Sequence, residues 1–101
     1  MSDSKLKKAL DDCAKALADA MAARAEVPHA MERGNKILLQ CQINIKYLQR
    51  HPDDEDVRAE LIKNTERLER DGPDAAIRAA ERAETEYVDC VNALDKIREG
   101  R

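Results

Sequence analysis

Three cysteines, Cys13, Cys41 and Cys90, are the residues of this 101-residue sequence whose chemistry is easiest to define. Two neighbouring thiolates can bind a soft metal ion or form a redox pair. A turn near residue 27 would place Cys13 and Cys41 at one level of adjacent helices, with Cys90 nearer the other end. Cys13 and Cys41 are therefore candidate metal ligands, and the simpler interpretation is that all three cysteines are small buried apolar residues. An odd number of cysteines without a C-x-x-C motif favours a reducing compartment.

The remaining reactive side chains do not form a catalytic set. His29 and His51 lie near expected turns, whereas each cysteine lies inside an expected helix, so no thiol has a histidine base within reach. Glu26-Val-Pro-His29 has the Glu-x-x-His spacing of di-iron bundles, but the motif occurs once and contains a proline. No serine follows Ser4. We therefore expect no enzyme activity and no cofactor.

Two asparagines fall on expected inward helix faces. Asn44 and Asn64 are predicted to form a polar core, either hydrogen-bonded to each other between helices or placed at the boundary and bonded to water. Thr65 and Asn92 are further candidates for such a network. With the cysteines, these amides support an alternative function, the binding of a small ligand or a soft metal in the core.

The segment from residue 37 to residue 48 carries apolar residues on two sides. Ile37, Leu38, Cys41, Ile45 and Leu48 form the expected core face. Leu39, Ile43 and Tyr47, spaced four apart, form a second stripe on the far side. An apolar stripe outside the core is either buried in a splayed bundle or available to a partner. Leu39, Ile43 and Tyr47 are thus the candidate partner-binding residues, with Tyr47 as the expected anchor.

Apolar residues recur every three to four positions throughout the chain, which predicts an all-α protein. Alanine dominates the apolar set, and the sequence contains no Phe or Trp. The length predicts a single domain over residues 1–101. We expect an antiparallel up-down bundle, most simply of four helices, and the small number of large aliphatic residues favours close packing through alanine or self-association.

The boundaries of the expected helices follow from turn-forming residues. In one arrangement the chain turns at Glu26–Pro28, giving four helices of similar length. In the alternative, a long Pro-kinked first helix continues to Arg33, turns at Gly34-Asn35 and is followed by three further helices. Later breaks are predicted at His51-Pro52 and at Gly72-Pro73. The expected core residues are Leu6, Leu10, Cys13, Leu17, Ala20 and Met21 in the first helix, Val57, Leu61, Thr65 and Leu68 after residue 52, and Ile77, Ala80, Tyr87, Val91 and Leu94 after residue 73.

The charge distribution limits the classes of partner. Basic and acidic residues alternate, and the net charge is −3, which argues against a nucleic-acid partner because such proteins carry a basic stripe. The apolar runs are too short to cross a bilayer, and the N-terminus has no apolar export segment. We expect a soluble cytoplasmic or recombinant protein, no membrane partner, and either homo-oligomerisation or a protein target.

Two segments carry a resemblance. His51-Pro-Asp-Asp-Glu-Asp-Val-Arg-Ala-Glu-Leu61 and Arg70-Asp-Gly-Pro-Asp-Ala-Ala-Ile-Arg-Ala-Ala-Glu81 resemble the loop-plus-helix starts of de novo designed helical bundles and helical-repeat proteins. The resemblance covers the C-terminal half and is compositional. It implies a scaffold or binder without a natural substrate. A structural or protein-interaction role is therefore the expected function.

Overall fold

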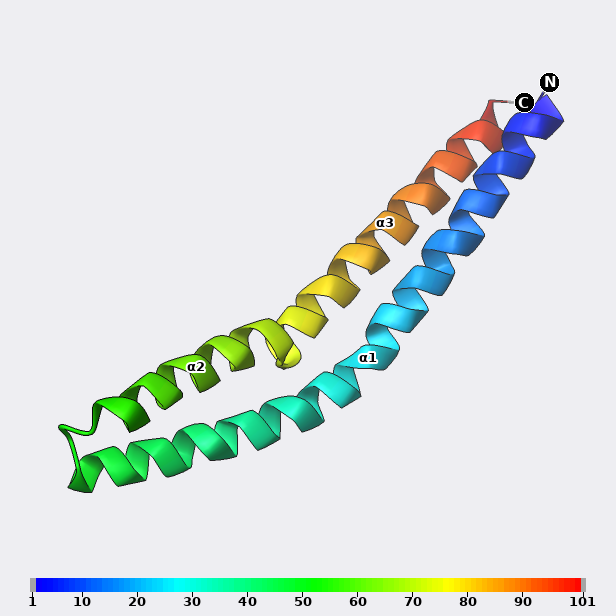
Figure 1. Ribbon diagram of the computed structural model, residues 1–101. Helices are drawn as coiled ribbons and strands as arrows, with labels where there is room; N and C mark the ends of the chain where they lie inside the picture. Colours follow the sequence, from blue (N-terminus) through cyan, green and yellow to red (C-terminus); the bar gives the residue numbers. More distant parts are fainter. Residues whose placement is uncertain (1, 101) are drawn as a thin grey trace. The chain divides into compact units, whose positions relative to one another are not determined.

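The computed structural model describes residues 2–100, which form three α-helices and contain no strand (Figure 1). Helix α1 spans Ser2–Arg50, α2 spans Glu55–Asp71 and α3 spans Pro73–Glu99. Backbone contacts divide the chain into two units. The terminal unit consists of residues 2–25 and 77–100, and the hairpin unit consists of Glu26–Ala76. The prediction of an all-α fold is confirmed.

The prediction of a four-helix antiparallel bundle is wrong, because α1 is a single helix of 49 residues. It continues through Pro28, where the first arrangement placed a turn, and through Gly34-Asn35, where the alternative placed one. Pro28 is exposed, so water can solvate the carbonyl that lacks a proline N–H donor. Val27 and Ala30, on either side of it, are both buried. Packing of the inner face therefore outweighs the helix-breaking tendency of proline.

Gly34 serves close packing within the hairpin unit and does not end a helix. It is buried, and a Cβ atom at this position would lie 2.6 Å from Cδ of Pro73. Within residues 2–100, no residue adopts a positive φ, and this includes the glycines. Gly34 is thus required by the approach of the Pro73 ring, because any side chain would have to displace an atom fixed to the backbone.

The two later breaks occur where the sequence predicts them. The side chain of Asp54 accepts a hydrogen bond from the Val57 amide at 3.2 Å and caps the start of α2. At the other end of α2, the Gly72 amide donates to the Leu68 carbonyl at 2.9 Å. A Cβ atom on Gly72 would collide with that carbonyl oxygen. Gly72 therefore ends α2, and Pro73 begins α3 at the position that proline favours.

The inner face of α1 follows a strict alternation of three and four residues, the spacing of a coiled-coil seam. All of its buried or half-buried described residues follow this spacing: Leu6, Ala9, Cys13, Ala16, Ala20, Ala23, Val27, Ala30, Gly34, Ile37, Cys41, Asn44 and Leu48. Five residues expected in the core are exposed instead: Leu10, Leu17, Met21, Leu38 and Ile45. The seam uses alanine at many positions, and the larger residues lie beside it.

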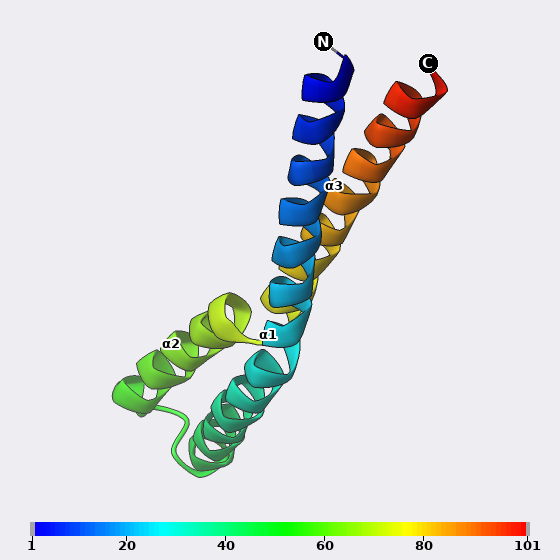
Figure 2. The same cartoon turned by 90° about the vertical axis from the view of Figure 1, so that its right-hand side faces the viewer.

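In the terminal unit, α1 and α3 run antiparallel, as both views show (Figures 1 and 2). The α3 seam repeats the same spacing in this unit through Ala80, Ala83, Tyr87, Cys90, Leu94 and Ile97. Ala20 and Ala80 are 4% and 0% exposed. Small side chains on both helices let the two backbones approach closely.

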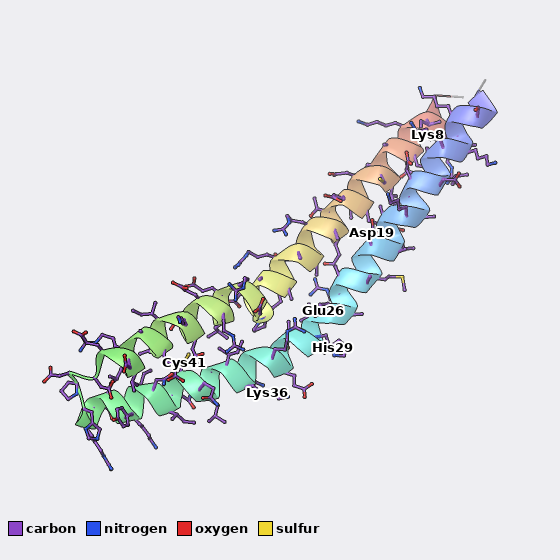
Figure 3. All side chains as sticks on the ribbon, viewed as in Figure 1. Lys8, Asp19, Glu26, His29, Lys36 and Cys41 are labelled. Carbon is purple, nitrogen blue, oxygen red and sulfur yellow. The ribbon has the colours of Figure 1, made fainter. Side chains whose placement is uncertain are left out.

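In the hairpin unit, the second half of α1 packs antiparallel against α2. The α2 seam consists of Val57, Leu61, Asn64 and Leu68. Thr65, expected inside, is exposed and bonds to the Leu61 carbonyl of its own helix at 2.9 Å. Cys41 lies on the side of α1 toward α2, and Lys36 points away from it (Figure 3).

Candidate functional site

The largest group of exposed apolar residues lies near the C-terminal end of α1. Leu39, Ile43 and Tyr47, the predicted stripe, are 55%, 53% and 42% exposed. Leu38 and Ile45 are exposed as well. Leu39, Ile43 and Tyr47 form what we term the apolar patch. Leu39, Ile43 and Ile45 also line a shallow hollow together with Gln42 and Lys46.

Tyr47 is held in place by the loop that follows α1. Its ring lies 4.5 Å from the His51 ring, centroid to centroid. A hydrogen bond to the Asp54 side chain is the main cause of a raised Tyr47 pKa, to which burial and the charge of Asp54 contribute. Tyr47 therefore has a structural role within the hairpin unit, while its ring remains partly exposed in the apolar patch. Leu39 and Ile43 are the more accessible members.

The charged residues in the segment that carries the apolar patch are all basic. Residues 33–50 contain Arg33, Lys36, Lys46 and Arg50 and no acidic residue. The segment that follows has the opposite charge, since the residues at positions 53–56 are all acidic. The hairpin unit thus has a basic segment that carries the apolar patch and an acidic segment at the start of α2.

The two predicted polar-core residues are brought together. Asn64 Nδ2 donates to Asn44 Oδ1 at 2.9 Å, and both residues are buried at 6% and 5% exposure. Arg67 donates a longer bond of 3.4 Å to Asn64 Oδ1. No buried side-chain nitrogen or oxygen among the described residues lacks a partner. This pair joins α1 to α2 at one register, and it is a paired structural feature.

The cysteines are paired differently from the sequence-based expectation. Cys13 and Cys41 are both buried, but α1 runs without a turn between them, so the turn that would bring them to one level is absent. Cys13 instead lies at the level of Cys90 of α3, since its neighbour Asp12 lines one hollow together with Cys90. Burial raises the pKa of Cys13, and the charge of Cys90 and a hydrogen bond with its side chain add to this effect.

The other candidate ligands are dispersed. Glu26 forms an ion pair with Arg33 at 2.8 Å, and His29 is exposed. Within residues 2–100, no group of three or more His, Cys, Asp or Glu side chains is arranged to hold a metal ion. The two histidines are therefore best described as surface residues.

Two interhelical contacts were not predicted from the sequence. Arg24 forms a bidentate bond with Glu84 of α3, with distances of 2.9 and 2.5 Å. This bond raises the pKa of Arg24 and lowers that of Glu84. The second is the placement of Cys13 and Cys90 at one level of the terminal unit. Both depend on which residues of α1 and α3 lie opposite each other, and no local sequence signal gives that register.

No helix in the described part of the chain combines the length and apolar character needed to cross a bilayer. Comparison of the chain with protein-family models, with curated proteins and with solved structures found no match.

Proposed function

We propose that this protein is a non-enzymatic structural module that self-associates, with the apolar patch of one copy packing against the hairpin unit of a second copy. The observation that carries the proposal is the exposure of Leu39 and Ile43, each more than half accessible. Fully burying an exposed Leu or Ile side chain contributes about 1.5–3 kcal/mol, and roughly half of each side chain remains to be buried, so two of them on each of two copies provide about 3–6 kcal/mol.

The extent of exposed surface supports association. The chain exposes 7699 Å², whereas about 5,800 Å² is typical of a folded monomer of 11.4 kDa. Among the residues whose burial the structure describes, eight apolar ones are buried, and three of these are alanine. A chain that buries this little apolar surface by itself gains stability from a partner, because conformational entropy opposes folding at every residue.

The charges favour a second copy over an unrelated partner. In a two-fold symmetric dimer, each surface contacts its counterpart on the other subunit. The basic segment 33–50 of one copy can then lie beside the acidic start of α2 in the other, at residues 53–56. Opposite charges at the rim of an apolar contact fix orientation and exclude other arrangements.

The decisive experiment is the solution mass of the full-length chain, measured by analytical ultracentrifugation over a range of concentrations. We expect the wild-type chain to have twice the monomer mass of 11.4 kDa. The double variant Leu39→Glu and Ile43→Glu should be monomeric, with a dissociation constant raised at least ~100-fold, because two charges would have to be buried. Its helix content should be unchanged because both positions are exposed.

A matched control distinguishes the apolar patch from apolar surface in general. Val88 lies on α3 in the terminal unit and is 52% exposed, close to the values for Leu39 and Ile43. Val88→Glu should leave the dimer intact. A wild-type chain that sediments as a monomer at 100-fold different concentrations, or a double variant that dimerises like the wild type, would refute the proposal.

The alternative of a soft metal or small ligand held by Cys13 and Cys41 receives no support from the geometry, since α1 has no turn between them. The resemblance to designed helical proteins, and the scaffold role it implies, stays a prediction. A self-associating helical module is compatible with either a natural or a designed origin.

A further inference from the structure

The terminal unit contains a pair of thiols that no part of the proposed self-association uses. We propose that Cys13 and Cys90 form a redox-active dithiol site that reacts with low-molecular-weight disulfides and closes into a disulfide between α1 and α3. The proposal concerns one unit of one chain and does not depend on the oligomeric state.

The helix register places the two thiols together. Cys13 and Cys90 both occupy seam positions, at 7% exposure for Cys13 and partial burial for Cys90. A hollow in this unit is lined by Ala9 and Asp12 of α1 together with Cys90 and Ala93 of α3. Cys13 directly follows Asp12, so it lies at the level of Cys90. The raised pKa of Cys13, to which burial contributes most and Cys90 adds, agrees with this placement.

The alanine-rich seam makes the distance suitable for a disulfide. Helix axes are separated by about 8–10 Å depending on the side chains between them, and alanine favours the lower end. A disulfide requires Cα atoms roughly 4.4–6.8 Å apart. Ala9, Ala16 and Ala20 precede and follow Cys13 in the seam, and Ala83 precedes Cys90. Close approach of the two backbones is therefore built into this unit.

The two thiols differ in access, which assigns them different roles. Cys90 lines the hollow, whose rim carries Lys5 and Lys8. These ammonium groups attract an anionic oxidant such as oxidised glutathione. Cys13 is buried and is not among the residues that line the hollow. Cys90 is thus the thiol that an oxidant reaches first, and Cys13 is the resolving thiol.

The reaction proceeds by two thiol–disulfide exchanges. The Cys90 thiolate attacks one sulfur of the oxidant RSSR, which breaks the S–S bond, expels RS⁻ and forms a mixed disulfide on Cys90. The Cys13 thiolate then attacks the Cys90 sulfur and expels the second RS⁻. Two protein thiols are oxidised, one RSSR is reduced to two RSH, and the two thiol protons pass to the departing thiolates.

The Cys13–Cys90 disulfide would link the N-terminal part of α1 covalently to α3. A bond between residues 13 and 90 closes a loop that contains most of the sequence, and a long loop gives a disulfide its largest effect on the unfolded state. The terminal unit is otherwise joined mainly through alanine contacts and the Arg24–Glu84 ion pair. Oxidation is therefore expected to raise the melting temperature by about 10 °C or more.

The test uses the full-length chain incubated with oxidised glutathione, followed by thiol counting in denaturant and peptide mapping without reduction. We expect one remaining thiol, on Cys41, a cross-linked peptide pair containing Cys13 and Cys90, and the higher melting temperature. Cys41→Ala is the matched control because Cys41 is buried in the other unit. It should form the same bond and leave no free thiol.

Single variants separate the two roles. Cys13→Ala should stop the reaction at one glutathione on Cys90, and Cys90→Ala should lose the reaction and the thermal shift. Alanine is already common in both seams, so both variants should keep their helix content by circular dichroism. Three free thiols after oxidation of the wild type, a bond that includes Cys41, or a bond between two chains would overturn the proposal.

Discussion

The two units use the same seam spacing but fill it with different side chains. In the terminal unit, alanine occupies half of the positions where α1 and α3 meet, and Ala80 is completely buried. In the hairpin unit, Ile37 and the leucines of α2 pack around a buried pair of asparagines. One spacing therefore supports two kinds of interface. In the terminal unit the helix backbones approach closely, whereas in the hairpin unit larger side chains interlock and the buried asparagine pair fixes the register.

This difference predicts opposite responses to mutation. A close-packed alanine seam has no room for larger residues, whereas a seam with a buried polar pair depends on both members being present. The terminal unit should thus be sensitive to enlargement, and the hairpin unit should be sensitive to loss of a hydrogen-bonding partner. Three measurements, given in order of decreasing expected effect, test this difference between the two units.

The largest effect is expected for Ala80→Leu. Ala80 is 0% exposed, so the added atoms must separate α3 from α1, at a cost of about 1–3 kcal/mol in the free energy of unfolding. Ala18→Leu is the matched control because Ala18 lies in the same unit on the exposed side of α1. Urea denaturation followed by circular dichroism measures both. Equal stability of the two variants would show that the terminal unit is loosely packed.

The second prediction concerns the amide pair of the hairpin unit. Asn44→Leu removes the acceptor of the 2.9 Å bond and leaves the buried Asn64 amide without it, which should cost about 1–2 kcal/mol. The double variant Asn44→Leu and Asn64→Leu should recover most of that loss, because both polar groups are then gone. A double-mutant cycle by denaturation measures the coupling. Additive losses from the two single changes would mean that the bond contributes nothing.

Much of the architecture could be predicted from the sequence because its signals are local. The break at Gly72-Pro73 and the cap at Asp54 depend on a few neighbouring residues, and both occur as predicted. Pro28 and Gly34 carry the same kind of signal, yet α1 continues through both. At Gly34 the deciding contact is with Pro73, thirty-nine positions later, and a local pattern contains no information about it.

The core assignments failed for a different reason. Leu10, Leu17 and Met21 give a strong three-to-four repeat, but the seam follows the alanines one position earlier, Ala9, Ala16 and Ala20. Volume alone favours the larger residues, whereas close approach of two helices favours the smaller ones. The match of Cys13 with Cys41 failed because it required a turn near residue 27, where α1 is continuous. The Arg24–Glu84 pair depends on the register of α1 against α3, which no local pattern gives.

The smallest effect is expected at Arg24 and Glu84, where the terminal unit compensates for its small side chains with an ion pair at the surface. The hydrogen bond from Arg24 lowers the pKa of Glu84 from its ordinary value of 4.5, as a carboxyl NMR titration should show. Arg24→Gln should return the Glu84 pKa toward 4.5, whereas Lys15→Gln, a charge removed elsewhere in the same unit, should not.

The sign of the linked stability follows from the direction of this shift. Because the folded pKa of Glu84 lies below its unfolded value, the contribution of the pair is fully present above about pH 4.5 and is lost as the pH falls through the lower folded value. Both side chains are more than 40% exposed, so salt should weaken the effect. If the Glu84 pKa is identical in the wild type and in Arg24→Gln, the ion pair does not contribute to stability. Close packing of the seam residues is then the main contact between α1 and α3.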